Sequence, residues 1–332
     1  MLPIALDVMG GDHGPDELVA GAVEAAEQGI PVLLVGDPEQ IGDLHGLELL
    51  AASEVIEMHD DPGSSVRNKK DSSVVRAAEA VRDGRAGAMI SAGNTGAAMA
   101  SALLRLGRLP KVARPAIATP IPVPGSTPTV LLDAGANADV QAPWLVQFAQ
   151  MGSVFSRCRF GVQNPRVALL SIGEEDTKGS QLVKEARGLL RDAAGINFIG
   201  NVEGRDFLRP KADVVVTDGF TGNVVLKTLE GGVGYMVEMF KKMMSNLLTE
   251  QTGPGLMGEA EPLLRQLDPN TYGGAMLLGV EGVCIISHGS SSASAISNAL
   301  GVARDMVETD VVSQLREAVT ASKNGSTNDE VS

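Results

Sequence analysis

The sequence predicts an α/β fold in which a mostly parallel sheet is covered by helices on both faces. Short runs of Val, Ile and Leu alternate along the chain with longer Ala-rich segments of helical periodicity. Several short runs, such as 214–216 and 168–170, are apolar at successive positions instead of at every second one. Such runs are typical of central strands that are buried on both sides.

The predicted elements follow one another in this alternating order. The strand candidates are residues 4–8, 31–35, 54–58, 86–91, 129–133, 166–172, 213–217 and 282–287. The helix candidates are residues 16–28, 72–82, 95–106, 143–157, 180–193, 222–248 and 291–319. The proline-rich stretch 115–128 fits either a crossover between lobes or an extended edge strand, because proline cannot donate a hydrogen bond inside a sheet.

The length of 332 residues predicts one large unit or two lobes, at about 150 residues per domain. We expect residues 1–319 to form a single unit, with a division into two lobes left open. Residues 229–268 are expected to form a projecting helical segment, and the polar tail 320–332 is expected to be frayed. An apolar stripe at helical spacing runs along that segment and fits the core, a dimer interface or a membrane surface. Its members are Met236, Met239, Phe240, Met243, Met244, Leu247 and Leu248.

Composition excludes several classes of protein. A net charge of −14 argues against a large nucleic-acid surface, and an aromatic content of 3% argues against base-stacking platforms. Cys158 and Cys284 lack the spacing of a disulfide framework or a zinc site, and no metal-ligand cluster or nucleotide-binding motif is present. No signal peptide or membrane-spanning run is found, so the expected location is the cytoplasm, with peripheral contact at the inner membrane face left open.

Five predicted strands end in loops rich in Gly, Asn, Asp and Ser. We expect these loops to meet at one edge of the sheet, where free N–H groups at helix starts favour a phosphate-sized anion. Together with the late loop 288–291, they supply the candidate substrate-binding residues. These are Gly10, Gly11, Asp12, Asn94, Thr95, Gly96, Asp133, Asn137, Asp218, Thr221, Gly222, His288 and Ser290.

Several motifs in order resemble the bacterial phosphate acyltransferase family of phospholipid synthesis. They are DVMGGD (7–12), SAGNTGA (91–97), LDAGAN (132–137), GNVEGRD (200–206), TDGFTGN (217–223), YGGA (272–275) and HGSS (288–291). The resemblance covers about residues 1–315. It implies transfer of a fatty acyl group from acyl carrier protein to inorganic phosphate, without a cofactor. It also implies the αβα sandwich shared with phosphotransacetylase and isopropylmalate dehydrogenase, a homodimer, and a product passed to a membrane glycerol-phosphate acyltransferase.

In that reaction phosphate itself is the nucleophile, so no covalent intermediate is required and the protein must supply positioning and charge stabilisation. The candidate catalytic residues are Lys178, which would neutralise charge, Asn223, which would donate to phosphate or the oxyanion, and His13. His13 and His288 fit a phosphate contact or a proton donor to the leaving thiolate. The alternatives are a solvated lysine, a helix N-cap at Asn223 or Asn94, and histidines that only brace loops. The aspartates fit loop capping or orientation of Lys178.

An acid-free stretch between residues 84 and 132 predicts a docking patch for the acidic carrier protein on this acidic chain. Its residues are Arg105, Arg108, Lys111 and Arg114, although these cations could also lie on unrelated faces. Two rival functions stay open: a phosphotransacetylase-like enzyme that uses acyl-CoA, and a non-catalytic phosphate-binding scaffold. A hydroxyacid dehydrogenase would need an acidic metal cluster, which the sequence lacks.

Overall fold

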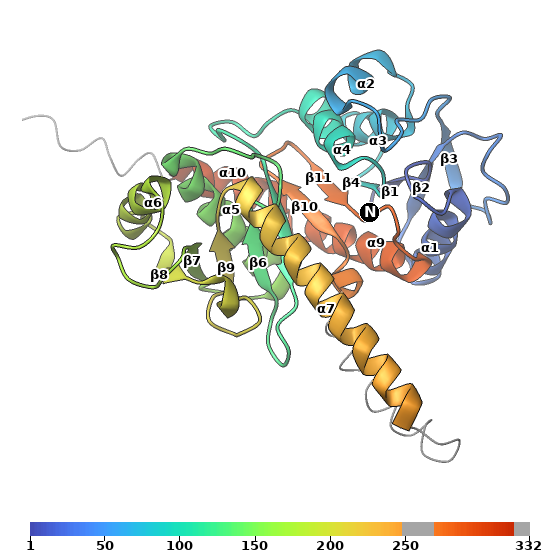
Figure 1. The fold of residues 1–332 in the computed structure, drawn as a ribbon. Coiled ribbons are helices and arrows are strands. Elements are labelled where there is room, and N and C mark those ends of the chain that lie inside the picture. Colours follow the sequence, from blue (N-terminus) through green and yellow to red (C-terminus); the bar gives the residue numbers. More distant parts are fainter. Residues whose placement is uncertain (248–268, 322–332) are drawn as a thin grey trace, which may run out of the picture.

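The computed structural model describes residues 1–247 and 269–321, and within them it shows one mixed sheet between two layers of helices (Figure 1). The predicted αβα sandwich is confirmed. The sheet has 11 strands among the described residues, in the order β3-β2-β1-β4-β11-β10-β5-β6-β9-β7-β8. The strands are β1 (Ile4–Asp7), β2 (Val32–Gly36), β3 (Glu48–Ala51), β4 (Ala88–Ser91), β5 (Ala116–Ile121), β6 (Thr129–Leu132), β7 (Arg166–Leu170), β8 (Asn197–Val202), β9 (Val214–Val216), β10 (Ala275–Leu278) and β11 (Val283–Ile286).

The two ends of the sheet run in opposite directions. Strands β3, β2, β1, β4 and β11 are parallel to one another, and so are β6, β9, β7 and β8. Between them, β10 is antiparallel to β11 and to β5, and β5 is antiparallel to β6. These three reversals place the loops after β1 and β4 at one edge and those after β6, β7 and β9 at the other. The expectation that all five loops share one edge is therefore wrong.

Each face of the sheet has its own apolar core. One face is covered by α1 (Pro15–Glu27), α5 (Ala142–Phe160), α6 (Gln181–Arg191), α9 (Ala293–Glu308) and α10 (Val311–Ala321). The other face, here called the second face, is covered by α2 (Pro62–Asn68), α3 (Ser73–Arg82), α4 (Thr95–Ser101), the π-helical turn η1 (Ala102–Leu106) and the start of α7 (Gly219–Leu247). Residues of each strand point to the two cores in turn, which explains the continuous apolar runs.

Some predicted elements differ from the structure. Residues 54–58 form no strand beyond a single bridge from Glu54 to Ser72, and the edge strand is β3 instead. The predicted helix 291–319 is two helices, because the chain turns at Asp310, which has a φ of 48°. Sequence patterns missed α2, β8 and β10, which are short or, in β8, interrupted by Gly200.

The proline-rich stretch contains β5, which lies inside the sheet. β10 pairs only with residues 116–118 of β5, so Pro120 lies beyond the paired part of that side. Because β10 does not extend as far as Pro120, the proline has no strand partner on that side, as at the edge of a sheet.

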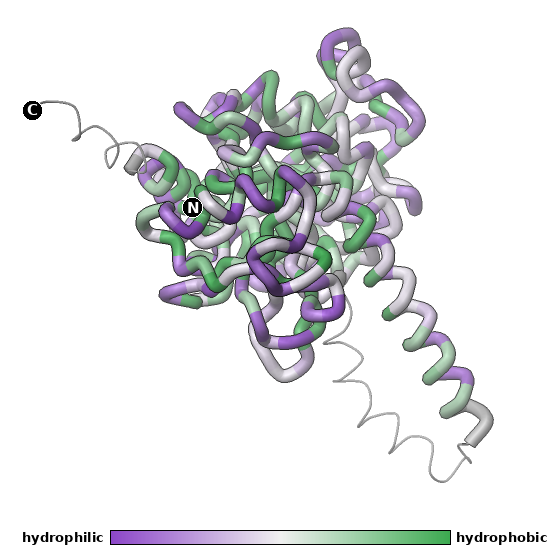
Figure 2. The backbone as a smooth tube through the Cα atoms, turned by 60° about the vertical axis from the view of Figure 1, so that its left-hand side comes forward, coloured by the Kyte–Doolittle hydropathy of each residue, from purple (hydrophilic) through white to green (hydrophobic). Residues whose placement is uncertain are grey.

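The outer half of α7 projects from the body of the protein (Figures 1 and 2). Met236 is 71% exposed there, and Met239 and Met243 are also exposed. Residues 248–268 of the predicted projecting segment lie outside the described residues. Of the predicted tail, residues 320 and 321 belong to α10 and the remainder is not described. Within the described part of the chain, no helix is both long enough and apolar enough to cross a membrane.

Candidate active site

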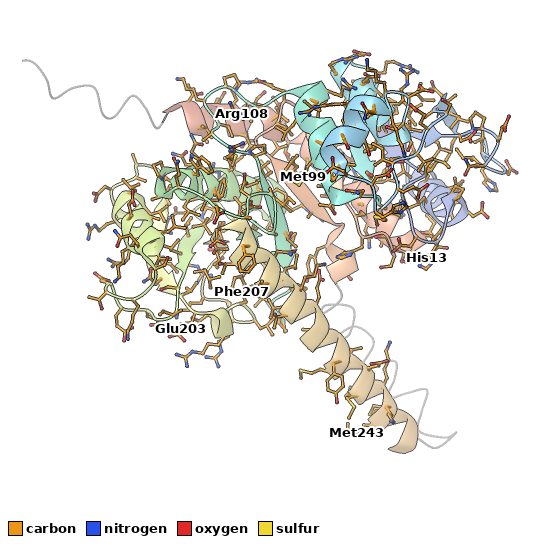
Figure 3. The ribbon with its side chains drawn as sticks, turned by 45° about the horizontal axis from the view of Figure 1, so that its top comes forward. His13, Met99, Arg108, Glu203, Phe207 and Met243 are labelled. Carbon is orange, nitrogen blue, oxygen red and sulfur yellow. The ribbon has the colours of Figure 1, made fainter. Side chains whose placement is uncertain are left out.

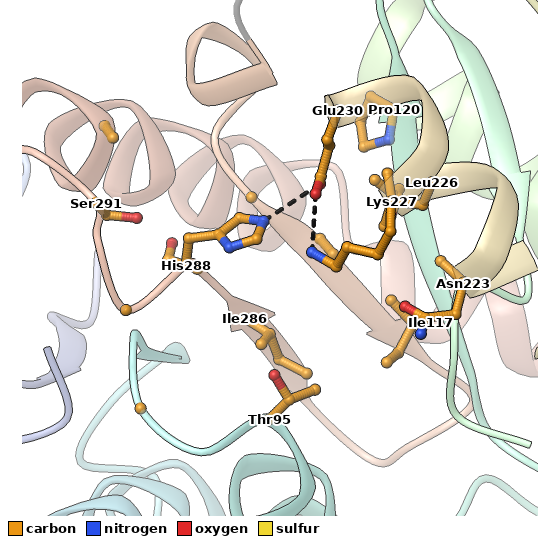
Figure 4. Close-up of a pocket in the computed structure, with 18 of the residues that line it drawn as sticks. Thr95, Ile117, Pro120, Asn223, Leu226, Lys227, Glu230, Ile286, His288 and Ser291 are labelled. Carbon is orange, nitrogen blue, oxygen red and sulfur yellow. Dashed lines mark hydrogen bonds and ion pairs between the residues drawn. The ribbon is translucent and has the colours of Figure 1, made fainter. Parts of the chain in front are cut away.

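An open pocket of about 250 Å³ lies on the second face, between the start of α4 and the start of α7 (Figure 4). Its floor consists of side chains from three strands. They are Ile117 and Thr119 of β5, Ala275 of β10 and Ile286 of β11. Strands β5 and β10, at which the sheet changes direction, are here called the reversed strands. The floor residues alternate along their strands with residues of the opposite core, so the pleat directs them all to the same face. The floor is mostly apolar, and no residue that the structure describes forms a hydrogen bond with the buried Thr119 hydroxyl.

One wall of the pocket is a face of α7. Asn223, Leu226, Lys227 and Glu230 line the pocket at helical spacing of three and four residues. The helix begins at the edge where β9 ends and reaches the opposite edge by Glu230, about 16 Å further on at 1.5 Å per residue. Helix α7 therefore links the loop after β9, at one edge of the sheet, to the loop after β11, at the opposite edge.

The start of α7 is held by Asp218, directly before the helix, and by the loop after β6. Asp218 accepts hydrogen bonds from the backbone N–H of Thr221 at 2.7 Å and from its hydroxyl at 2.8 Å. Gly222 lies so close to the carbonyl oxygen of Asp133 that no β-carbon would fit. Asn223 is thus not an N-cap, since it lies in the second turn. Its exposed amide has no hydrogen-bond partner among the described residues and is available to a ligand.

The loop after β6 is organised around the buried carboxylate of Asp133. Its oxygens accept hydrogen bonds from five donors: the backbone N–H groups of Ile117, Gly135, Ala136 and Asn137, and the amide of Asn137. Burial raises the pKa of Asp133 above its ordinary value, although these bonds favour the charged form. The Asn137 amide also donates to the carbonyl of Pro115 at 2.8 Å, so both residues are structural and keep Ala134 at the pocket.

Opposite α7, the loop after β11 brings His288 to the pocket. Its Nε2 lies 3.3 Å from Oε1 of Glu230, whose Oε2 accepts a hydrogen bond from Nζ of Lys227 at 2.8 Å (Figure 4). Burial acts to raise the pKa of Glu230, but the bonds from His288 and Lys227 outweigh it and hold that pKa below its ordinary value. The ammonium of Lys227 and the imidazole of His288 therefore converge on one carboxylate.

The third side of the pocket is the loop after β4. Gly93 and Thr95 line the pocket. Gly93 packs against Gly10, and a β-carbon on Gly10 would lie 2.6 Å from the Cα of Gly93. Below this contact the Ser91 hydroxyl donates to the buried carboxylate of Asp7 at 2.7 Å. Asn94 caps α4 by accepting from Ala97, and its amide donates to the carbonyls of residues 57, 58 and 60. Asn94 is therefore a loop brace and a helix cap.

The structure places the predicted site residues unevenly. Thr95, Asn223 and His288 line the pocket. Asp133, Asn137, Asp218, Thr221 and Gly222 build its frame. Lys178 lies on the exposed loop after β7 and is not among the lining residues, so its catalytic role stays a prediction. His13, an exposed residue of the loop after β1, is also not among the lining residues, and neither are Asp12 and Ser290. Their predicted roles stay predictions. Gly10 and Gly11 lie behind the lining, and Gly96 packs against Pro62 of α2.

Lys227 and Glu230 were not predicted from the sequence, although a signal was present. They follow Asn223 by four and seven residues on a predicted helix, which places all three on one face. No group of three or more potential metal-ligating side chains occurs among the residues that the structure describes.

The predicted docking residues differ in their surroundings, and their role in docking stays a prediction. Arg105 turns towards α3, where its Nε lies 3.4 Å from the carboxylate of Glu79. Arg108 donates to the carbonyl of Ala113, and the Arg114 guanidinium lies over the Trp144 ring, so the segment 108–114 forms one basic loop. Its Arg108 pairs with Val280 in the turn between β10 and β11, at the opposite end of those strands from His288. In Figure 3, Arg108 lies far from the outer end of α7, which Met243 marks.

Comparison with known proteins identifies the family. A model of the fatty acid synthesis protein family matches residues 2–314. The chain belongs to this family. It is 50% identical over 331 residues to the phosphate acyltransferase of Heliobacterium modesticaldum, with 95% of this chain and 97% of that protein covered. It is 46% identical over 323 residues to the phosphate acyltransferase of Nostoc sp., with 94% and 95% covered. The predicted resemblance is confirmed, and with it the prediction of an acyltransferase enzyme.

Solved structures show where the fold occurs elsewhere. A branched-chain phosphotransacylase from Enterococcus faecalis has a TM-score of 0.60 at 15% identity, with 92% of this chain and 99% of that chain covered. A 4-hydroxythreonine-4-phosphate dehydrogenase from Klebsiella pneumoniae has a TM-score of 0.53 at 14% identity, with 92% and 100% covered. At these identities the similarity concerns the fold alone.

Proposed function

We propose that this family member transfers a fatty acyl group from an acyl thioester of acyl carrier protein to inorganic phosphate, giving an acyl phosphate. The observation that carries the proposal is the pocket itself. The cationic Lys227, the imidazole of His288 and the free amide of Asn223 surround a largely apolar floor. A small anion and the apolar end of an acyl group would therefore meet in one place. The relatives' name, phosphate acyltransferase, supports the same pair of substrates.

In the proposed reaction a phosphate oxygen attacks the thioester carbonyl carbon and forms a tetrahedral intermediate. Lys227 neutralises the phosphate, and the Asn223 amide donates to the oxygen that gains negative charge. The C–S bond then breaks, the carbonyl re-forms, and the sulfur leaves as a thiolate, which takes a proton from His288 or from water. No acyl-enzyme forms at any step, so the protein acts by holding two substrates in line.

The acyl donor distinguishes this proposal from its rivals. Acyl carrier protein is acidic, and the basic loop 108–114 offers it a complementary surface on an otherwise acidic protein. An acyl-CoA donor is the alternative, since its phosphates would also favour cations. The alternative of a phosphate-binding scaffold predicts no turnover with either donor.

The test is to incubate the full chain with palmitoyl-acyl carrier protein and labelled phosphate, and to detect acyl phosphate as its hydroxamate after trapping with hydroxylamine. We expect product with the carrier-protein donor and a much smaller kcat/KM with palmitoyl-CoA. A preference for the CoA donor would replace the carrier-protein assignment, and no product with either donor would refute the enzyme proposal. Release of free thiol without phosphate, in a stoichiometric burst, would refute direct attack.

A further inference from the structure

Glu230 is the only carboxylate among the described residues that line the pocket, and it contacts both Lys227 and His288 there. Lys227 donates to one of its oxygens at 2.8 Å, and His288 lies 3.3 Å from the other. These are the groups that the proposed function assigns to phosphate and to the leaving thiolate. His288 Nε2 has at most one N–H and Lys227 gives one of its three N–H donors to Glu230, so Glu230 competes with the substrates for both groups.

Charge repulsion between Glu230 and phosphate also opposes their binding at the same time. A phosphate dianion held by Lys227 would lie within a few ångströms of the ionised Glu230, and like charges at such a distance oppose binding strongly in a partly buried site. The Glu230 side chain is 23% exposed, so it borders solvent and has room to turn outwards. Its position on α7 is otherwise unchanged by such a rotation, since only the side-chain torsions alter.

We propose that Glu230 is an internal competitor for the anion site, which phosphate dianion displaces and which monoanionic carboxylates do not. The proposal rests on the proposed function. A tethered carboxylate has a high effective concentration beside Lys227, so a free carboxylate gains little by replacing it. Phosphate carries more charge and more acceptor oxygens, and it can engage Lys227 and Asn223 together. Glu230 thereby selects phosphate over fatty acids, whose tails would suit the apolar floor.

The same competition assists product release. The acyl phosphate keeps its phosphoryl group beside Lys227 after transfer. When Glu230 swings back, it competes with that group for the lysine and for His288. A site with an unopposed lysine would retain the product longer, so removing the carboxylate should strengthen product inhibition.

The test uses Glu230→Gln in the full chain, with Glu238→Gln on the exposed outer part of α7 as the matched control. We expect KM for phosphate to fall roughly 10-fold in Glu230→Gln, because an opposing charge is removed. Inhibition by acetate and by palmitate should become stronger by a similar factor, while KM for the acyl donor stays unchanged. Glu238→Gln should leave all these constants at their wild-type values.

A KM for phosphate that is unchanged or higher in Glu230→Gln would overturn the proposal, because a carboxylate that merely braces Lys227 and His288 would weaken phosphate binding when lost. Binding is also measured without turnover, as the rise in Tm produced by inorganic phosphate. That rise should be larger in Glu230→Gln and smaller in Lys227→Gln than in the wild type. A wild-type protein that makes no acyl phosphate refutes the proposed function instead, so the two failures are distinct.

Discussion

Gly222 packs directly against the carbonyl oxygen of Asp133, and this contact joins the first turn of α7 to the loop after β6. Because Asn223 is the next residue, its amide takes its position in the pocket from this close approach. The contact requires glycine for its small size and not for an unusual backbone torsion.

A β-carbon at residue 222 should disturb this contact. Gly222→Ala should lower the free energy of unfolding by about 2 kcal/mol through overpacking, and it should reduce kcat at least about 10-fold by displacing Asn223. The control is Gly234→Ala in the exposed part of the same helix, where a β-carbon meets nothing within 4 Å. That change should raise stability by up to about 1 kcal/mol, since alanine favours helix. Urea unfolding and steady-state kinetics of both variants measure these effects.

Asp133→Asn is predicted to be strongly destabilising despite its conservative shape. All five partners of the carboxylate are N–H donors, so an amide would point its own N–H₂ at one set of them. We expect the free energy of unfolding to fall by about 3 kcal/mol, the effect of losing hydrogen bonds to a buried charged group. Asp139→Asn, at an exposed position of the same loop, should stay within about 0.5 kcal/mol of the wild type. Equal stabilities of the two variants would contradict the structural role of the Asp133 carboxylate.

Asp7→Asn should behave in the opposite way. Burial raises the pKa of Asp7 above its ordinary value of 3.8. The unfolded chain therefore loses its proton at lower pH than the folded protein, and stability is lost as the pH rises from about 4 through the raised pKa. Asparagine does not titrate, and its amide can still accept from Met9 and donate to Ser91. The variant should equal or exceed the wild-type Tm at pH 7 and lose that advantage near about pH 4. A Tm below the wild type at pH 7 would contradict this prediction.

The basic loop 108–114 gives a prediction about the acyl donor. Combined Arg108→Glu, Lys111→Glu and Arg114→Glu should raise KM for acyl carrier protein about 10-fold at low salt, and the difference should shrink as salt screens the charges. Arg191→Glu on α6 is the control for a change of net charge elsewhere. Arg105 is left intact because its guanidinium is paired with Glu79. An unchanged KM at low salt would place docking elsewhere.

The exposed methionines on the outer half of α7 indicate a contact with another molecule. Met236, Met239 and Met243 are exposed on a helix that projects from the body, and we propose that a second copy of the chain packs there. Sedimentation velocity should show a dimer, and Met236→Glu with Met239→Glu should shift it to a monomer. If the variant stays dimeric but no longer floats with anionic liposomes that the wild type binds, the stripe contacts membrane instead.

The sequence predicted the elements well where the signal is local. The run 214–216 is a strand because three successive valines suit a position between two cores, and the spacing after residue 222 is a helix because its apolar positions repeat every three or four residues. The errors also have local causes. Asp310 ends α9 with a turn that no glycine or proline marks, and β10 is too short to show a period.

By itself the sequence determined the fold class, the family motifs and three pocket residues, Thr95, Asn223 and His288. These were visible because glycine-rich strand ends and helix starts show in neighbouring residues. Only the tertiary structure decided that Lys227 and Glu230 join them and that Lys178 lies elsewhere. The reason is the pair of reversed strands, β10 and β5, whose partners are distant in the sequence. They separate the loops into two edges, and α7 crosses the face between them to bring Glu230 to His288, 58 residues away.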